Sequence, residues 1–482
     1  MPISSPRILL VLSLGILASC NISMSREEQV ENILSTPTLS TSEKESFDGP
    51  YFAKGNWPEK NWWTQYGSNE LNSLIEKALV QNPSIQAVEQ RIEYAKSQAV
   101  IARAKLLPLV YFDASDQWQY LSENGLYRAL NPKIPLSNSQ IDFSLSFFYE
   151  FDFWSKYRNL YRAALSKKRA EIAETAQVAL ITSTGLAQAY FALRTNLLRK
   201  KIYEQIYEVR KNYFDLQTKM LNNSLYSKLV PLLSEEALFQ AQQWVYNIEQ
   251  EIAVNQHIVN ILAGQGPDEP LSLDEPIAPL PARLAVPSEI SLELLSRRPD
   301  LMAQIWRLDA LAYEVGSAKA DFWPNVNITG IAGFQAGSWS KLFEWISKTI
   351  GALPGLSLPV YTAGAIGANV DAKKALFDQA VYQYNELILQ SFNQVADLLA
   401  IGRAVYGEKE KQIQIVDNAK ARYGLTLLRQ QNGIDSALTS YQFLEELLQK
   451  KLEDVQLLYQ QYLVSISLTK ALGGGYYCAG AE

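Results

Sequence analysis

The chain has 482 residues, 48% of them hydrophobic and 20% charged, so it is long enough for a large ordered structure. The formal net charge of −6 provides no basic surface of the kind that binds nucleic acid, which argues against a nucleic-acid partner. The two cysteines, Cys20 and Cys478, lie near opposite ends and do not form the disulfide framework of a small exported domain.

Residues 1–19 have the features of a secretory signal. Arg7 precedes a short apolar run, and small residues follow it. The run is too short to cross a bilayer as a helix. It ends in Leu-Ala-Ser-Cys at Cys20, which resembles the lipobox of bacterial lipoproteins. The alternative is an ordinary signal peptide with a cysteine near its end.

In a lipobox protein, the thiol of Cys20 would carry diacylglycerol and its amine an acyl chain. Residue 21 is Asn21 rather than Asp, and in such lipoproteins this implies the outer membrane. We expect Cys478, in a glycine-rich tail, to be a free thiol. Apart from these covalent lipid groups on Cys20, no cofactor is expected.

An internal repeat organises the rest of the chain, because residues 79–108 recur at 295–324 without a gap. In each copy a helical pattern ends at a proline and an alternating, strand-like pattern begins. Repetition of this kind predicts two similar halves, each a long helical hairpin interrupted by a pair of strands. The matching residues are Pro83 and Pro299, Ala87 and Ala303, Arg91 and Arg307, Ala102 and Ala318, Ala104 and Ala320, and Pro108 and Pro324.

The periodicity predicts a helix, two strands, a long helix and a return helix in each half. In the first half these cover 69–107 with a break at Pro83, then 110–120, 141–151, 154–221 and 231–263. In the second half they cover 289–323, 326–334, 353–361, 364–431 and 434–471. The resulting domains are a signal (1–19), a lipidated, extended or poorly ordered leader (20–60), a first repeat (61–263), a proline-rich linker (264–287), a second repeat (288–472) and a tail (473–482).

The clearest strand pattern is 141–151, with apolar residues on one side and mostly polar residues on the other. A soluble, half-buried strand could show the same alternation. However, about ten alternating residues with flanking aromatic side chains are also what an outer-membrane strand requires.

Four strands of this type cannot insert as one copy, because a bare sheet edge is not tolerated in hydrocarbon and known barrels need roughly eight strands. Several copies must therefore share one barrel, and two, three or four copies would satisfy this condition. The segment 154–221 contains no proline and would be about 100 Å long as one helix, so it must belong to a coiled assembly.

The chain resembles the TolC-like outer-membrane efflux family, in its lipidated OprM/NodT-type branch. The residues that carry the resemblance are Leu295 through Gly330, Ala189 through Arg194, and Ala471 through Gly475. The resemblance implies a mainly α fold with membrane β-strands. Three chains with four strands each would form a twelve-stranded β-barrel, continued by a long α-helical coiled-coil barrel.

The resemblance also implies a location in the outer membrane, with the helices extending into the periplasm. The homotrimer would be a passive conduit for small molecules, working with a periplasmic adaptor and an inner-membrane transporter of the resistance-nodulation-division type. Type I protein secretion is an alternative within the same family. A lipidated periplasmic coiled-coil scaffold without a pore is a second alternative, against which the alternating strands argue.

The chain departs from relatives in two places. The turns into the long helices lack a glycine-arginine pair and read Phe-Trp-Ser-Lys at 153–156 and Tyr-Thr-Ala-Gly-Ala at 361–365. At the periplasmic tip, Thr439 and Gln442 occupy positions where some members carry rings of acidic residues.

The candidate periplasmic gate surrounds the tip at Asn432 and Gly433. We expect Asp435 and Arg429 to take part in a closed entrance; the alternative is that both are solvated on the outer face. A lone histidine, His257, and the acidic pair at 445–446 suggest no metal site or acid–base chemistry, and no phosphate-binding loop is present. The sequence therefore does not predict an enzyme.

Overall fold

The computed structural model describes residues 33–477, with gaps at 224, 226, 272, 274–276, 278–279, 282 and 289. The predicted signal, the predicted lipid attachment at Cys20 and the predicted free thiol of Cys478 all lie outside the described residues. The chain forms two compact units. The sheet unit consists mainly of Ile92–Ala170 and Ile305–Gln383, and the helical unit of Leu34–Arg91, Glu171–Gln304 and Tyr384–Glu482.

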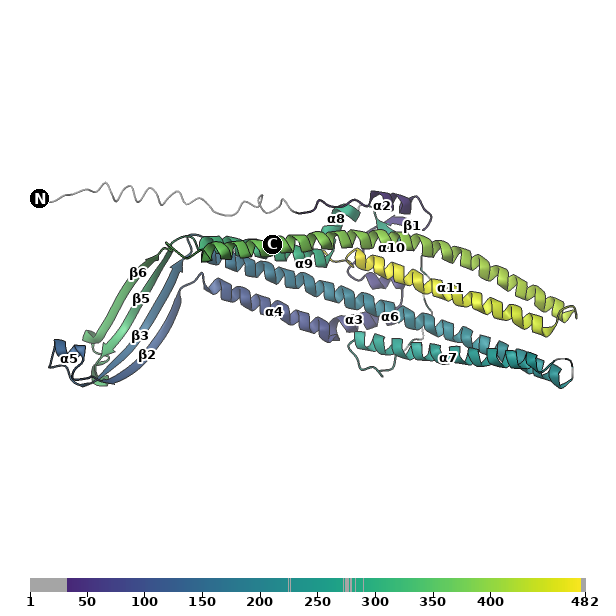
Figure 1. Cartoon of the computed structure of the whole chain (residues 1–482), viewed down its shortest axis with the longest axis horizontal. Helices are drawn as coiled ribbons and strands as arrows, with labels where there is room; N and C mark the ends of the chain where they lie inside the picture. Colours follow the sequence, from purple (N-terminus) through teal and green to yellow (C-terminus); the bar gives the residue numbers. More distant parts are fainter. Residues whose placement is uncertain are drawn as a thin grey trace. The chain divides into compact units, whose positions relative to one another are not determined.

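The sheet unit contains a four-stranded antiparallel sheet in the order β2-β3-β5-β6 (Figure 1). Each repeat contributes one neighbouring pair, and the pairing of β3 with β5 joins the two repeats. The strands are β2 Leu109–Tyr120, β3 Ser137–Phe151, β5 Asn325–Ala336 and β6 Lys348–Ser357.

The register of the sheet separates an apolar face from a polar face. Phe143 lies opposite Ala114 on β2 and Phe334 on β5, whereas Ser144 lies opposite Asp113 and Gly333. Because successive side chains alternate across a strand, each face keeps its character along the sheet. The predicted alternation of 141–151 is confirmed, and most of the strand residues are exposed in one copy of the chain.

The fourth strand is displaced from its predicted position at 353–361, because β6 begins at Lys348 and ends at Ser357. Gly351, Pro354 and Gly355 interrupt the alternating pattern on which the prediction relied. Proline is tolerated at the edge of a sheet, and β6 is an edge strand. The strand is therefore defined by its pairing with β5 rather than by its own sequence.

The helices follow the same order in both repeats, so the internal duplication is present in the fold. The first repeat contains α3 Asn69–Gln81, α4 Pro83–Ala104, α6 Lys156–Asn222 and α7 Leu229–Leu262. The second contains α8 Ile290–Arg297, α9 Pro299–Ala320, α10 Ala365–Gln431 and α11 Ala437–Ala471.

The break at Pro83 is confirmed, and a matching break at Pro299 separates α8 from α9, where a continuous helix was predicted. Proline lacks the N–H that a helix interior needs and is favoured at the first helical position. The repeat pairs these two prolines, so this second break could have been predicted. Among the described helices, none carries an apolar stretch long enough to cross a bilayer.

The core of the helical unit lies where α3, α6, α7 and α11 meet. One cluster includes Leu71, Leu186, Phe191 and Tyr462, all essentially buried. A second cluster, around Ile206, lies further along α6 and includes residues of α7 and α11. The predicted long helical hairpins are thus held together by apolar side chains at helical spacing.

Part of the leader is ordered, contrary to expectation. Residues Ser40–Phe47 form α2, and Phe52–Gly55 form β1, which pairs in parallel with β4, Leu284–Pro287, from the proline-rich linker. Trp62–Tyr66 form a 3₁₀ turn, η1, whose aromatic rings are buried. The polar composition concealed this order, because the pairing joins segments far apart in the chain.

Candidate functional site

The predicted tip of the second hairpin is the turn between α10 and α11. Gly433 has a φ of 73°, a left-handed conformation that glycine adopts readily. The Asn432 side chain donates a hydrogen bond to the carbonyl of Leu428 at 2.7 Å and so satisfies the end of α10.

Arg429 and Asp435 bind each other within this tip. The guanidinium Nε lies 2.7 Å from Oδ2 of Asp435, and Nη2 lies 3.1 Å from Oδ1. This two-pronged geometry is the stronger form of an arginine–carboxylate pair. The hydrogen bond from Arg429 holds the pKa of Asp435 below its usual range, although the pair is open to solvent.

Thr439 and Gln442 support the tip rather than carry charge. Ser436 caps α11 by accepting a hydrogen bond from the backbone N–H of Thr439 at 3.2 Å, and the two hydroxyls lie 3.0 Å apart. The Gln442 amide donates to the hydroxyl of Tyr213 on α6 at 3.3 Å. Gln442 therefore links the two hairpins near their ends.

A partly buried ion pair joins the hairpins just behind the tip. Arg210 on α6 binds Glu445 on α11 at 2.7 Å, and its guanidinium lies 4.5 Å from the ring centroid of Trp244 on α7. Glu445 is thus held between the hairpins as a structural ion-pair partner. Arg210 is too distant in sequence for any local pattern to indicate the pair.

The first strand-to-helix turn contains a non-glycine residue in the left-handed conformation. Ser155 has a φ of 59°, directly before α6. Asp152 stabilises the start of the helix, because its carboxylate accepts hydrogen bonds from the N–H groups of Tyr157 at 3.1 Å and Arg158 at 2.8 Å. The second turn behaves similarly, with φ values of 49° at Ala363 and 83° at Gly364.

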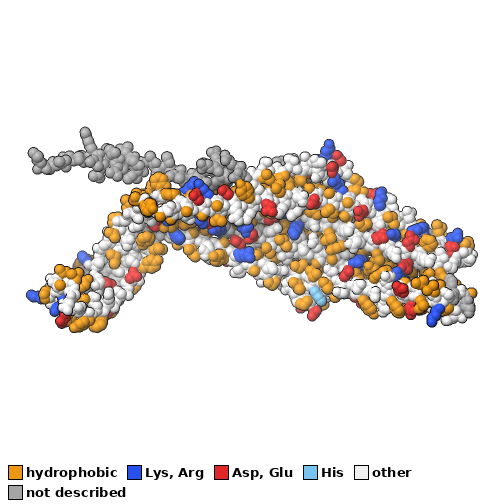
Figure 2. Space-filling view, viewed as in Figure 1, with side chains coloured by type: hydrophobic (Ala, Val, Ile, Leu, Met, Phe, Trp, Pro, Cys, Tyr) orange, Lys and Arg blue, Asp and Glu red, His pale blue; other side chains and the backbone are white. Residues whose placement is uncertain are grey.

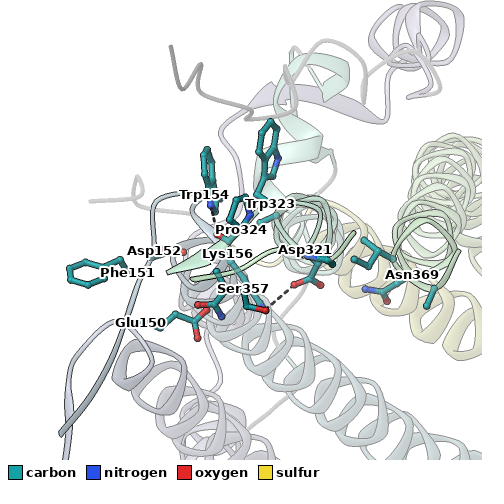
Figure 3. A pocket seen from close by; sticks show the side chains of 15 residues that line it. Glu150, Phe151, Asp152, Trp154, Lys156, Asp321, Trp323, Pro324, Ser357 and Asn369 are labelled. Atoms are coloured by element: carbon teal, nitrogen blue, oxygen red, sulfur yellow. Dashed lines mark hydrogen bonds and ion pairs between the residues drawn. The ribbon is translucent and has the colours of Figure 1, made fainter. Parts of the chain in front are cut away.

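A pocket of about 430 Å³ lies beside the first turn (Figure 3). Trp154 stacks on Trp323 with ring centroids 4.8 Å apart, and its indole N–H donates to the carbonyl of Pro324 at 2.7 Å. Lys156 forms an ion pair with Asp321 at 2.9 Å. These contacts tie the start of α6 to the end of α9, within the sheet unit.

Tyr157 adds a further contact to this turn. Its hydroxyl donates to Glu150 at 2.8 Å, and burial together with this hydrogen bond raises the pKa of Tyr157 to about 12. The tyrosine is therefore neutral at physiological pH and acts as a hydrogen-bond donor.

The sequence motifs that carry the family resemblance contain buried side chains that bind neighbouring segments of the chain. Arg298 is nearly buried, binds Asp300 through two hydrogen bonds of 2.7 and 3.1 Å, and donates to the carbonyl of Ala471 at 3.2 Å. A Cβ on Gly473 would lie 2.0 Å from the carbonyl oxygen of Arg297. The Leu295 and Ala471 motifs therefore meet, and glycine is required where they touch.

The third motif, Ala189 through Arg194, forms a polar node on α6. Arg194 lies 3.0 Å from Glu70, and the hydroxyl of Tyr190 donates to the same carboxylate at 2.7 Å. Beside them, Phe191 stacks on Tyr462 with centroids 3.8 Å apart. These residues bind one another, so their role is to position helices rather than to bind a ligand.

Within the described part of the chain, no cluster of three histidine, cysteine or acidic residues could hold a metal ion. His257 lies 3.9 Å from Asp268 and is half exposed. The described residues thus include a hairpin tip in the helical unit, and two strand-to-helix turns and a sheet with opposed faces in the sheet unit.

Comparisons with known proteins agree with this architecture. The family model described as "Outer membrane efflux protein" matches residues 74–259 and 291–474. The multidrug resistance outer membrane protein MdtQ of Escherichia coli O6:H1 is 26% identical over 434 residues, which cover 89% of this chain and 90% of that protein. MdtP of Escherichia coli K12 is 26% identical over 436 residues, covering 89% of each chain.

Solved structures show the same fold. The outer membrane protein VceC of Vibrio cholerae superposes with a TM-score of 0.78 at 29% identity, covering 87% of this chain and all (100%) of that one. The CmeC outer membrane channel of Campylobacter jejuni gives a TM-score of 0.81 at 21% identity, covering 96% of both chains. The two segments that the family model matches cover more than half of the chain, and they show that this chain belongs to the outer membrane efflux protein family.

Proposed function

We propose that the chain is the outer-membrane channel component of a tripartite efflux system. Copies of the chain form a closed barrel from their four-stranded sheets, and their long hairpins extend into the periplasm. The observation that carries this proposal is a sheet with one apolar and one polar face and an unpaired strand at each edge, β2 and β6.

The unpaired edges require partners of the same kind. An exposed backbone N–H or C=O costs several kcal/mol in hydrocarbon, so the β2 edge of one copy must pair with the β6 edge of another. We propose three copies and hence a twelve-stranded barrel, as in the family that the sequence resembles.

The polar face would line the conduit. Its charged side chains are Asp113, Asp142 and Glu150, and the strand positions that share this face carry no lysine or arginine. The conduit through the barrel would therefore be acidic and favour cations over anions. It would be passive, without catalytic activity or a cofactor.

We further propose the partners that the resemblance implies: a periplasmic adaptor and an inner-membrane transporter of the resistance-nodulation-division type. The names of MdtQ and MdtP support small molecules as cargo. Lipid attachment at Cys20 and the domain division given in the sequence analysis, with repeats at 61–263 and 288–472, belong to the same proposal.

Single-channel recording tests the proposed conduit. Purified full-length protein, reconstituted in planar bilayers, should form ion-conducting trimers, with the oligomeric state measured by native mass spectrometry. A stable, water-soluble monomer, or an inserted trimer that never conducts even with its adaptor and transporter, would overturn it. Drug susceptibility and secreted protein, compared between a deletion strain and its complement, separate small-molecule efflux from type I secretion.

We propose that the tip residues Arg429, Asn432, Gly433, Asp435, Thr439 and Gln442 form the closed periplasmic entrance. The pair of Arg429 and Asp435 stiffens each tip, so Asp435→Ala and Arg429→Ala should raise the open probability of the channel. Arg422→Ala is the control, because it breaks another exposed ion pair, to Glu446, between the two helices that flank the tip. If both tip variants behave like this control, the pair has no part in gating.

The pH dependence of the tip has a definite sign. The folded-state pKa of Asp435 is lowered, so the ion pair persists at neutral pH and is lost only as the pH falls through that lowered value. Opening by acid should therefore begin below the usual aspartate range and be absent in Asp435→Ala.

A further inference from the structure

The connection between β5 and β6, residues 337–347, folds back onto the sheet; we refer to it as the rim loop. The ring of Phe343 lies 6.0 Å from that of Phe143 and 5.9 Å from that of Phe334. The ring of Trp339 lies 5.8 Å from Phe143. The loop that leaves β5 therefore packs on β3 as well as on its own strand.

The rim loop covers the apolar face rather than the polar one. Phe143 and Phe334 are directly paired on the apolar face, and the Trp339 indole N–H donates at 3.0 Å to Asp116, a β2 residue on the same face. Ile141, opposite Asp116, is 0% exposed. Leu145, on the same face further from the loop, is 52% exposed, so the cover is confined to one end of the sheet.

Besides the polar Ser340, Lys341 and Glu344, the rim loop exposes large apolar side chains. Trp345 is 75% exposed and Ile346 is 86% exposed, whereas Leu342 is fully buried. The ammonium of Lys348 lies 4.3 Å from the ring centroid of Trp345, and Lys341 is exposed nearby. Figure 2 shows hydrophobic side chains gathered at this loop-bearing end of the sheet.

We propose that the rim loop is a membrane-seated collar, with Trp345 and Ile346 inserted among the lipids of the outer leaflet. This inference rests on the proposed function, because the apolar face beneath the loop is then the lipid-facing face of the barrel. Aromatic side chains are favoured at the interface between hydrocarbon and headgroups. Lys341 and Lys348 can extend to the anionic headgroup phosphates while their stems remain in apolar surroundings.

The rim loop lies on the apolar face of the sheet, and for this reason we infer that its exposed apolar side chains contact lipid. The loop covers one end of the apolar face, and its most exposed side chains, Trp345 and Ile346, are themselves large and apolar. Trp345 and Ile346 follow one another in a 3₁₀ turn, Trp345–Ser347, at the start of β6. A neighbouring copy of the chain and an extracellular protein are the competing occupants, and the test distinguishes them.

The test places a polarity-sensitive nitrobenzoxadiazole label at Ile346→Cys in full-length protein that also carries Cys478→Ser. The matched control is Gln335→Cys, which lies on the polar face opposite Asp142 at the same end of the sheet. The same protein without an introduced cysteine measures background labelling. Vesicles contain phosphatidylcholine and phosphatidylglycerol, with or without lipids that carry a nitroxide near the headgroup.

The collar predicts that the label at 346 has blue-shifted emission and loses most of its fluorescence to the nitroxide lipid, but little to aqueous iodide. The label at 335 should show the reverse. Quenching at 346 by iodide alone, or protection from both quenchers with crosslinking between copies, would overturn the collar. Trp345→Cys provides a second position if Ile346→Cys inserts poorly.

Conductance of the labelled protein separates the two proposals. If the labelled channels conduct and the label at 346 lies in water, the proposed membrane contact of the rim loop is wrong, whereas the proposed channel function is retained. If no variant conducts or inserts, the proposed function fails instead.

Discussion

The sheet unit and the helical unit differ in whether one copy of the chain buries its own apolar side chains. In the helical unit, Leu71, Leu186 and Tyr462 are fully buried by other parts of the same chain. In the sheet, Phe112, Leu145 and most of their neighbours stay exposed in one copy. One chain's own packing therefore positions the helices, whereas the sheet is left to be completed from outside.

This difference predicts in which unit a substitution should lower the stability of the protein most. Truncation of a side chain in the helical unit removes contacts that one chain makes with itself. The same truncation on the apolar face of the sheet removes contacts with lipid, which can rearrange. The following predictions compare the two regions directly, beginning with the largest effect.

Phe191→Ala should lower the free energy of unfolding by about 4 kcal/mol, because it leaves a cavity beside Tyr462. Phe112→Ala on the sheet removes the same atoms from a side chain that is 65% exposed and should have a much smaller effect. Denaturant unfolding of both variants in the same detergent measures the difference. Equal losses would contradict the contrast between the regions.

Arg298→Ala should destabilise the protein by about 3 kcal/mol, because it leaves Asp300 without its partly buried partner. Arg422→Ala, which breaks an exposed pair with Glu446, should be worth no more than about 1 kcal/mol. Thermal unfolding midpoints of the two variants test the ranking. A larger effect from the exposed pair would show that the contact between Arg298 and Asp300 does not stabilise the fold.

Leu145→Arg should reduce insertion into the outer membrane, with a penalty of about 2 kcal/mol for a charge on the lipid-facing side. Thr329→Arg places the same charge on the opposite face of the sheet and should be tolerated. The fraction of protein that resists urea extraction from membranes measures insertion. If Thr329→Arg is the more harmful change, the two faces have been assigned the wrong way round.

Ser155→Gly should stabilise the protein by up to about 1 kcal/mol, since glycine relieves the strain of a left-handed residue before α6. Ser155→Val keeps that strain, adds a branch at Cβ and should destabilise. Both can be measured by thermal unfolding. A glycine variant less stable than the wild type would show that the serine makes a contact that outweighs the strain.

Much of the fold could be predicted from the sequence, because the repeat, the 3.6-residue periodicity and the alternation of 141–151 are local or self-similar signals. β6 was misplaced because Pro354 and its glycines hide the alternation, and its position depends on pairing with β5. The pairing of β1 with β4 was missed for the same reason, since it joins distant segments.

The candidate tip could be located from Asn432 and Gly433, but its contacts could not. The helical pattern places Arg429 and Asp435 in or near the turn, yet only the geometry of the turn brings their side chains together. Arg210 and Glu445 belong to different hairpins, so no local spacing indicates their bond. The rim loop shows the same limit, because its packing on Phe143 depends on tertiary structure.

The pairing of β3 with β5 joins the strand hairpin of the first repeat to that of the second within one chain. In separate half-length chains, the two hairpins would have to meet by diffusion. A ring of three duplicated chains contains six such hairpins, but only three of its seams depend on encounters between molecules. Covalent linkage fixes the other three at synthesis, so closure of the cylinder should depend less steeply on concentration. Duplication thus acts on the kinetics of assembly as well as on shape.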